Sequence, residues 1–228
     1  MREIVFDTET TGMDPAEGHR LVEIGCVELV NLLPTGRHFQ AYLNPEREVP
    51  VDAFQVHGLS SEFLADKPRF CEIARALLDF LGDARLIAHN AEFDLRFVNW
   101  ELGNAGLAPL SASRVTDTLM MARQRFPGMR ASLDNLCRRF NIDLSARGKH
   151  GALLDAELLA EVYLELKGGR QKRLDLSRAA ESVDLEGEDG AVIAVSRARP
   201  PRPHQASAAE KAAHAAFLNG LHDPLWRR

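Results

Sequence analysis

The change of hydrophobic period along the chain constrains the fold more than any other feature. Three consecutive segments are rich in Val, Ile and Phe, as strands are; they are residues 2–10, 20–30 and 36–44, with turn material at 12–18 and 33–36. From residue 66 onward, amphipathic helical segments alternate with short strands. The helices are expected at 66–82, 91–106, 118–126, 132–140 and 151–169, and the strands at 85–89 and 113–117. Paired strands followed by alternating elements predict an α/β fold: a mixed sheet flanked by helices.

A change of composition at Gly168 and Gly169 divides the chain into a core and a tail. The next stretch is first acidic and then rich in proline and arginine, with few aromatic residues. This composition is typical of a flexible linker. We therefore expect a folded domain at 1–168, a linker at 169–206 and a helix-prone C-terminal segment at 207–228.

The composition bounds the possible functions. Hydrophobic residues make up 45% and charged residues 27% of the 228, and no apolar run approaches the length of a membrane span. The chain also begins directly with a strand-like segment rather than a secretory signal, so we expect a cytoplasmic protein. A net charge of -5 is not that of a protein that holds nucleic acid tightly by itself, so a nucleic-acid substrate would need affinity from another source.

Two carboxylates lie two positions apart on the first predicted strand. Asp7 and Glu9 in "FDTETTG" therefore project from the same face. Crowded anions require a raised pKa, a basic partner or a bound cation. For an isolated pair the commoner outcome is a solvent-exposed strand end, so other residues must decide.

Two further acids lie near the starts of predicted helices. Asp94 is one turn beyond Asn90, the expected helix cap, and taken alone it stabilises the helix dipole. His150 precedes the last core helix, and Asp155 interrupts the apolar positions of that helix. Taken alone, this pair favours a structural histidine and a capped helix.

Taken in order, the patterns D-x-E, H-N-x-x-F-D and H-x-x-x-x-D resemble the three exonuclease motifs of the DEDDh superfamily. Residues 1–168 also resemble the proofreading epsilon subunits of bacterial DNA polymerase III, through "DTETTG", "VHGLS", "VTDTLMMARQRFPG" and "HGALLDAELLAEVYL". The resemblance implies a ribonuclease-H-like five-stranded fold and a 3′ to 5′ DNA exonuclease that releases nucleoside 5′-monophosphates. It also implies His150 as general base and four metal-binding acids, Asp7, Glu9, Asp94 and Asp155.

The implied chemistry accounts for the crowded carboxylates. Two divalent cations activate water and stabilise the leaving oxygen in phosphodiester hydrolysis, and Mg²⁺ or Mn²⁺ prefers oxygen ligands. We expect Asp7 to bridge both ions, Glu9 and Asp155 to hold the ion that activates water, and Asp94 to hold the other largely through water. Neighbouring cations should keep His150 neutral and able to accept a proton.

Several residues are candidates for contact with a single-stranded or frayed 3′ DNA end. The resemblance places the loop of His57, and more weakly Asp52, beside the terminal nucleotide. Thr10 offers a hydroxyl and Phe93 a face for base stacking, next to Asp7, Glu9 and Asp155. Each is equally compatible with a role in a turn or in packing.

The tail contains two candidate docking segments. Residues 171–176, "QKRLDL", resemble the peptides that bind the sliding clamp, with Gln171, Leu174 and Leu176 as anchors, although such peptides more often carry a large aromatic residue. The C-terminal segment suits a helix laid in a groove of the polymerase catalytic (alpha) subunit. Its anchors are Phe217, Leu221, Leu225 and Trp226. A frayed terminus is the alternative, and the binding of a small third core subunit stays open.

Two other functions compete with proofreading. An exoribonuclease that trims RNA ends shares the same five residues, but small enzymes of that kind generally lack the two tail segments. A non-catalytic scaffold joining polymerase to clamp would not need all four acids and the histidine.

Overall fold

The computed structural model describes residues 1–145, 150–169 and 206–219. The chain divides into two units, residues 1–173 and 174–228. The described part of the second unit is the helix α8 (Ala208–Asn219). None of the helices in the described ranges has both the length and the apolar character that crossing a membrane requires.

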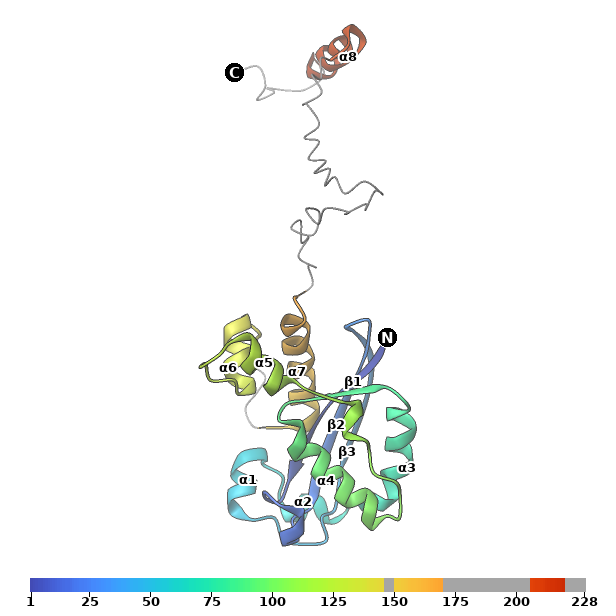
Figure 1. Ribbon diagram of the computed structural model, residues 1–228, viewed down its shortest axis with the longest axis vertical. Helices are drawn as coiled ribbons and strands as arrows, with labels where there is room; N and C mark the ends of the chain where they lie inside the picture. Colours follow the sequence, from blue (N-terminus) through green and yellow to red (C-terminus); the bar gives the residue numbers. More distant parts are fainter. Residues whose placement is uncertain (146–149, 170–205, 220–228) are drawn as a thin grey trace, which may run out of the picture. The chain divides into compact units, whose positions relative to one another are not determined.

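A five-stranded mixed sheet forms the centre of the first unit, as the hydrophobic periods predicted (Figure 1). Its order is β3-β2-β1-β4-β5, with β1 antiparallel to β2, β2 antiparallel to β3, and β4 parallel to both β1 and β5. The strands are β1 (Arg2–Thr10), β2 (Leu21–Val30), β3 (Leu33–Tyr42), β4 (Arg85–Ala88) and β5 (Val115–Asp117).

The third strand begins earlier than predicted. Residues 33–36 were expected to be turn material, but Leu33 already pairs with Val30. Asn31 and Leu32 both adopt positive φ angles, 53° and 69°, so two residues complete the reversal. A two-residue turn of this kind matches the twist of the flanking strands, so the hairpin closes at once.

The helices agree with prediction except between β3 and β4. Two short helices there were not predicted, and α3 begins at Phe70 rather than near Asp66, which instead ends α2. The Arg69 N–H donates to a Glu72 carboxylate oxygen (2.7 Å), which sets this helix start. The helices are α1 (Val51–His57), α2 (Ser61–Ala65), α3 (Phe70–Leu81), α4 (Ala91–Asn104), α5 (Thr118–Arg125), α6 (Leu133–Phe140) and α7 (Ala152–Leu166), with 3-10 turns at Pro15–Glu17 and Ala112–Arg114.

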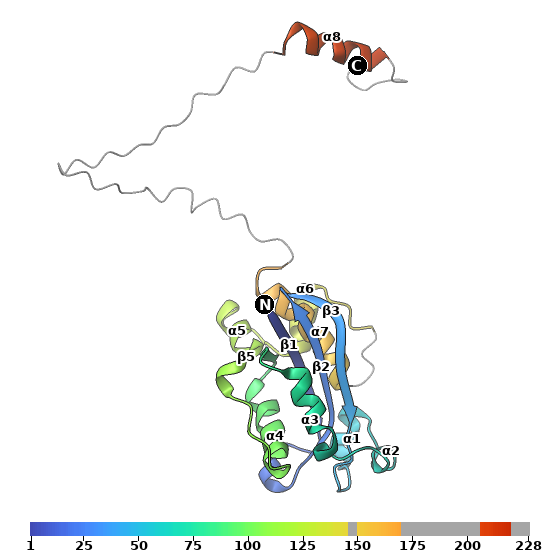
Figure 2. The same cartoon turned by 90° about the vertical axis from the view of Figure 1, so that its right-hand side faces the viewer.

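The side chains of β1 alternate between two cores, one on each face of the sheet. Ile4 and Phe6 pack with α3 and α4, whereas Val5 packs with α7. Figures 1 and 2 show α7 on one side of the sheet and α3 and α4 on the other. Because successive side chains on a strand point to opposite faces, Asp7 and Glu9 follow Val5 onto the α7 face.

Candidate active site

The end of β1 places two carboxylates beneath the start of α7. Asp7 is opposite Gly25 on β2, and Glu9 is opposite Glu23. Directly opposed residues of antiparallel strands point to the same face. The four positions therefore form one small area of the sheet, and α7 covers it.

Gly25 allows α7 to approach this area closely. A Cβ atom at this position would overlap main-chain atoms of Ala152 and Leu153. The buried Glu23 carboxylate lies beside it and accepts a hydrogen bond from the Ala152 N–H (3.1 Å). The lack of a side chain at Gly25 permits the close approach, and this hydrogen bond holds the beginning of α7 against β2.

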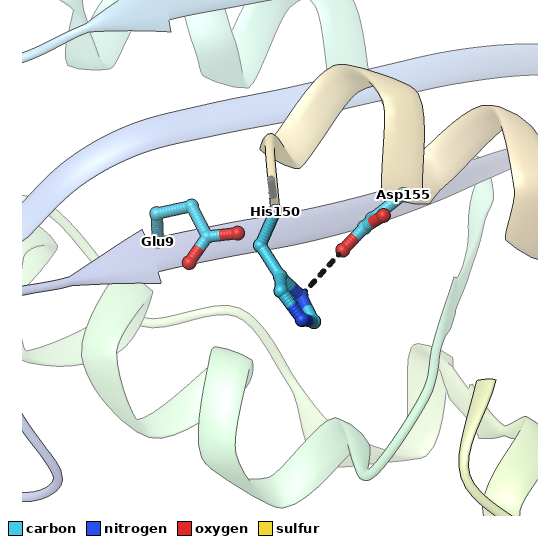
Figure 3. Close-up of side chains that lie close together, drawn as sticks. All are labelled: Glu9, His150 and Asp155. Carbon is cyan, nitrogen blue, oxygen red and sulfur yellow. Dashed lines mark hydrogen bonds and ion pairs between the residues drawn. The ribbon is translucent and has the colours of Figure 1, made fainter. Parts of the chain in front are cut away.

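Glu9, His150 and Asp155 form a cluster at this junction. One potential ligand atom from each lies within 4.8 Å of the others. His150 Nδ1 is 3.1 Å from Asp155 Oδ2, and Figure 3 shows Glu9 on the other side of the imidazole. The Glu9 and Asp155 side chains are buried, whereas that of His150 is 48% exposed, so water reaches the imidazole. Asp7 and Asp94 lie outside this three-residue cluster.

Asp94 is connected to the same strand through Thr8. The Thr8 hydroxyl donates to Asp94 Oδ1 (2.6 Å), and both side chains are buried. Asp94 lies in the first turn of α4, as predicted, but the Asn90 side chain does not cap that helix. Instead, Asn90 adopts a left-handed conformation and its N–H donates to Asp117 Oδ1 (3.1 Å). Asp117 also accepts from the Leu119 N–H, so it orders the turn between strand and helix.

Burial and crowding favour the protonated forms of these acids. Burial raises the pKa of Glu9 to about 8; the His150 charge opposes this shift, and the charges of Asp155, Glu23 and Asp94 add to it. Burial likewise raises the pKa of Asp94 to about 7, against the Thr8 hydrogen bond. Full ionisation at neutral pH therefore requires additional positive charge in the site.

The donor set fits divalent cations. Within the described ranges, no lysine or arginine forms an ion pair with Glu9 or Asp94. Carboxylate oxygens are the protein ligands that Mg²⁺ and Mn²⁺ prefer, and Glu9 and Asp155 supply them here. A cation would supply the missing charge, so the residues present are compatible with metal binding.

Comparison with known proteins identifies the family. Residues 4–163 match the RNase_T exonuclease family. The chain is 45% identical over 237 residues to the DNA polymerase III subunit epsilon of Escherichia coli, covering 99% of this chain and 97% of that one. The chain belongs to the DNA polymerase III epsilon family. Epsilon from Rickettsia felis is 56% identical over 174 residues, covering 75% of this chain and 76% of that one.

Solved structures of exonucleases share the fold of this epsilon-family chain. The nuclease domain of 3′hExo, a DEDDh family member solved with rAMP, superposes with a TM-score of 0.63 at 19% identity, covering 75% of this chain and 94% of that one. The predicted ribonuclease-H-like fold is thereby confirmed.

The structure gives the predicted substrate contacts different local settings. The loop expected around Asp52 and His57 is the helix α1, on which Asp52 is exposed and His57 is buried at the last position. His57 Nδ1 accepts from the Leu59 N–H (3.0 Å), which assigns the ring proton to Nε2. The His150 N–H donates to the Val56 carbonyl (3.3 Å), so the end of α1 lies next to the site.

Two other candidate substrate contacts, Thr10 and Phe93, interact with other groups of the protein. The Thr10 hydroxyl donates to the Gly12 carbonyl (2.7 Å), so it closes the turn after β1. The Phe93 ring is half-buried and packs against Phe97, with 5.0 Å between ring centroids. Both residues remain predicted contacts.

Sequence reasoning missed Thr8, Glu23 and Gly25. A glycine inside a strand signals a close approach of other backbone, and this signal was present at Gly25. The roles of Thr8 and Glu23 depend on strand register and on contacts across 86 and 129 residues, which the sequence does not display.

The predicted tail contacts are mostly outside the described residues. This applies to Gln171, Leu174 and Leu176 of the clamp-binding segment, and to Leu221, Leu225 and Trp226 of the polymerase-binding segment. Phe217 is described, on α8, and is 62% exposed.

Proposed function

We propose that this chain is the proofreading 3′ to 5′ exonuclease of a bacterial replicative DNA polymerase. Its reaction is hydrolysis of the terminal phosphodiester bond, with release of a nucleoside 5′-monophosphate. The convergence of Glu9, His150 and Asp155 at the start of α7 carries this proposal, together with the epsilon-family relationship.

The acids would hold two divalent cations, Mg²⁺ or Mn²⁺, in the proposed mechanism. When bound, these ions make water more acidic and stabilise charge on the phosphate and on the leaving 3′ oxygen. Asp7 would bridge them, Glu9 and Asp155 would bind the ion on the side of the attacking water, and Asp94 would bind the other mainly through water. Glu9 then becomes ionised despite its burial.

His150 would act as the general base. Asp155 engages Nδ1 (3.1 Å), so Nε2 is the nitrogen assigned to accept the proton of the attacking water. The water oxygen forms a bond to phosphorus as the bond from phosphorus to the 3′ oxygen breaks. The 3′ oxygen leaves on the shortened strand and takes up a proton.

The substrate would be a single-stranded or frayed 3′ end of DNA. A mismatched terminus frays more easily than a paired one, so access to the site selects errors without base-specific contacts. His57 and Phe93 would contact the last nucleotide, with weaker contributions from Thr10 and Asp52. A small site that reads sugar, phosphate and stacking suffices for this selection.

The tail would connect the enzyme to the replication machinery in the cytoplasm. Residues 171–176 would bind the sliding clamp, and residues 207–228 the catalytic subunit of the polymerase. Similarity to epsilon of Escherichia coli over 99% of the chain supports a polymerase III association. Tethering raises the effective DNA concentration to the millimolar range for short linkers, so weak intrinsic affinity suffices.

The two competing functions find less support. The curated relatives are named as a DNA polymerase subunit, which disfavours an enzyme that trims RNA. A non-catalytic scaffold would have no use for a buried acid cluster, because the burial of these carboxylates lowers folding stability unless a cation is bound.

The deciding experiment uses the full-length protein with Mg²⁺ and 3′-labelled single-stranded DNA or RNA. We expect labelled mononucleotide from DNA, and faster release from a mismatched than from a matched duplex end. Asp7→Ala should release none. Release from neither nucleic acid would support the scaffold, and preferential release from RNA would support the RNA-trimming function.

A further inference from the structure

Helices α5 and α6 carry a local positive charge that the overall composition conceals. Residues 118–140 contain five arginines and one aspartate, a net charge of +4 in a chain whose total is -5. All five arginine side chains are exposed; we call them the α5–α6 basic surface, and they are Arg123, Arg125, Arg130, Arg138 and Arg139. Clustered basic side chains create a local positive potential, which is the electrostatic feature expected of a site for a polyanion.

Two of these arginines make contacts within the protein. Arg125 donates to the main-chain oxygens of Glu165 and Leu166 at the end of α7 (2.6 and 2.8 Å). Arg139 lies 4.0 Å from the centre of the Phe126 ring. These contacts attach the basic surface firmly to the core.

The other three arginines have no acidic partner among the described residues. Arg123, Arg130 and Arg138 form no ion pair there. A guanidinium group binds a phosphate through two parallel hydrogen bonds. These three side chains therefore present suitable donors for a phosphate backbone.

The basic surface lies along the helix that carries one of the catalytic acids. Both α5 and α6 pack on α7, the helix that carries Asp155 (Figure 1). Burial, and after it the charge of Asp155, raises the pKa of Cys137 on α6 to about 11, so α6 lies within electrostatic range of the site. Helix α5 starts directly after Asp117, which holds the start of α4 and thus Asp94 in place.

An acidic site with a polyanionic substrate presents an electrostatic problem that this arrangement solves. Each nucleotide behind the 3′ end adds a negative charge, which the cluster around Glu9 and Asp155 repels until cations bind. Positive charge beside the cluster lowers the electrostatic energy of the strand along its path. Charge complementarity therefore selects the sugar-phosphate backbone as the partner of this surface.

We propose that the α5–α6 basic surface binds the phosphate backbone of the DNA strand upstream of its 3′ terminus. The inference rests on the proposed function for the identity of the substrate. Contacts to phosphate position the strand without reading its sequence, as proofreading of any base requires. The chain then binds DNA through this one surface although its net charge is -5, and its affinity for DNA falls as the salt concentration rises.

The test replaces Arg123, Arg130 and Arg138 with glutamine, singly and together. Arg75→Gln is the matched control, because Arg75 is also exposed but lies on α3, on the opposite face of the sheet. With a single-stranded oligonucleotide, the triple variant should raise KM at least about tenfold and leave kcat unchanged. The slope of log(kcat/KM) against log salt should become shallower by about 0.7 for each phosphate that the variant no longer binds, or roughly 2 in total.

A second substrate separates this inference from the proposed function. The p-nitrophenyl ester of thymidine 5′-monophosphate has no upstream backbone, so the triple variant should hydrolyse it as fast as the parent. No ester or DNA hydrolysis by the parent would refute the proposed function itself. With an active parent, a triple variant whose KM and salt slope match Arg75→Gln overturns the inference. Impaired ester hydrolysis in the triple and single variants also overturns it, because the arginines would then act on the site or the fold.

Discussion

The main-chain N–H of Ala152 donates a 3.1 Å hydrogen bond to the buried Glu23 carboxylate and so fastens the start of α7 to β2. Gly151, the N-cap residue of α7, has no side chain to cap the helix, so Glu23 acts as a cap from the neighbouring strand. Glu23 is also opposite Glu9 in the β1–β2 ladder. One residue thus relates the helix bearing Asp155 to the strand bearing Glu9.

Glu23→Ala should lower both stability and activity. The Ala152 N–H would lose its buried acceptor, which costs about 1–3 kcal/mol of unfolding free energy. A shift of Asp155 by about 1 Å should reduce kcat up to about 100-fold. Glu23→Gln retains an acceptor oxygen and should recover most of the activity.

Tyr163→Phe is the control for Glu23, because Tyr163 donates to the buried Glu3 (2.8 Å) at the far end of α7. It should destabilise the protein by a similar amount, measured by urea unfolding, without changing kcat. Equal losses of kcat in Tyr163→Phe and Glu23→Ala would show that Glu23 acts only through stability.

Gly25→Ala should displace the start of α7. The added methyl group would overlap main-chain atoms of Ala152 and Leu153, which cannot rotate away as a side chain does. We expect a loss of about 1–3 kcal/mol or more in unfolding free energy and a large loss of exonuclease activity. Gly103 lies in the exposed part of α4, and a Cβ added there would meet no atom within 4 Å beyond its own helix backbone and chain neighbours. Gly103→Ala should therefore be neutral or stabilising. Full activity in Gly25→Ala would mean that close packing of α7 is not needed.

His150→Ala should lower kcat by about 10²–10⁴-fold, the usual contribution of a general base. Binding of Mn²⁺, measured by calorimetry, should persist because the carboxylates remain. His38→Ala removes an exposed histidine on β3 and should have no effect. A rate within a few-fold of the parent would refute the assignment of His150 as base.

Removal of divalent cations should make stability fall as pH rises. The pKa of Glu9 is raised from 4.5 to about 8, and that of Asp94 from 3.8 to about 7. Between about pH 5 and 8 the folded chain therefore binds more protons than the unfolded chain, and the unfolding free energy decreases with pH. Thermal unfolding in EDTA should show Tm falling over this range.

Cations should reverse this trend, since binding to the ionised acids stabilises the folded state. Mn²⁺ should therefore raise Tm more at pH 8 than at pH 5. The double variant Glu9→Gln with Asp94→Asn should show a flatter pH dependence in EDTA. A double variant with the same slope as the parent would assign the pH dependence to other groups.

Asp155→Asn should lower exonuclease activity at least about 100-fold, because it removes a negative charge from the cation site. Calorimetry should show weaker Mn²⁺ binding. Asp117→Asn changes an acid that orders a turn rather than one assigned to metal. Its amide oxygen can still accept the N–H groups of Asn90 and Leu119, so the variant should retain Mn²⁺ affinity. Unchanged Mn²⁺ affinity in Asp155→Asn would remove Asp155 from the proposed ligands.

The sequence by itself determined the elements and the candidates. Periodicity is a local property, so the mixed sheet, α4 to α7, and the positions of Glu9, Asp94 and Asp155 on their elements followed from nearby residues. Only the tertiary structure decided the start of β3, the helices α1 and α2, and the partnership of Glu23 with Ala152. These depend on register and on contacts between distant segments, whose free energies are set by which residues oppose one another in space rather than by their spacing along the chain.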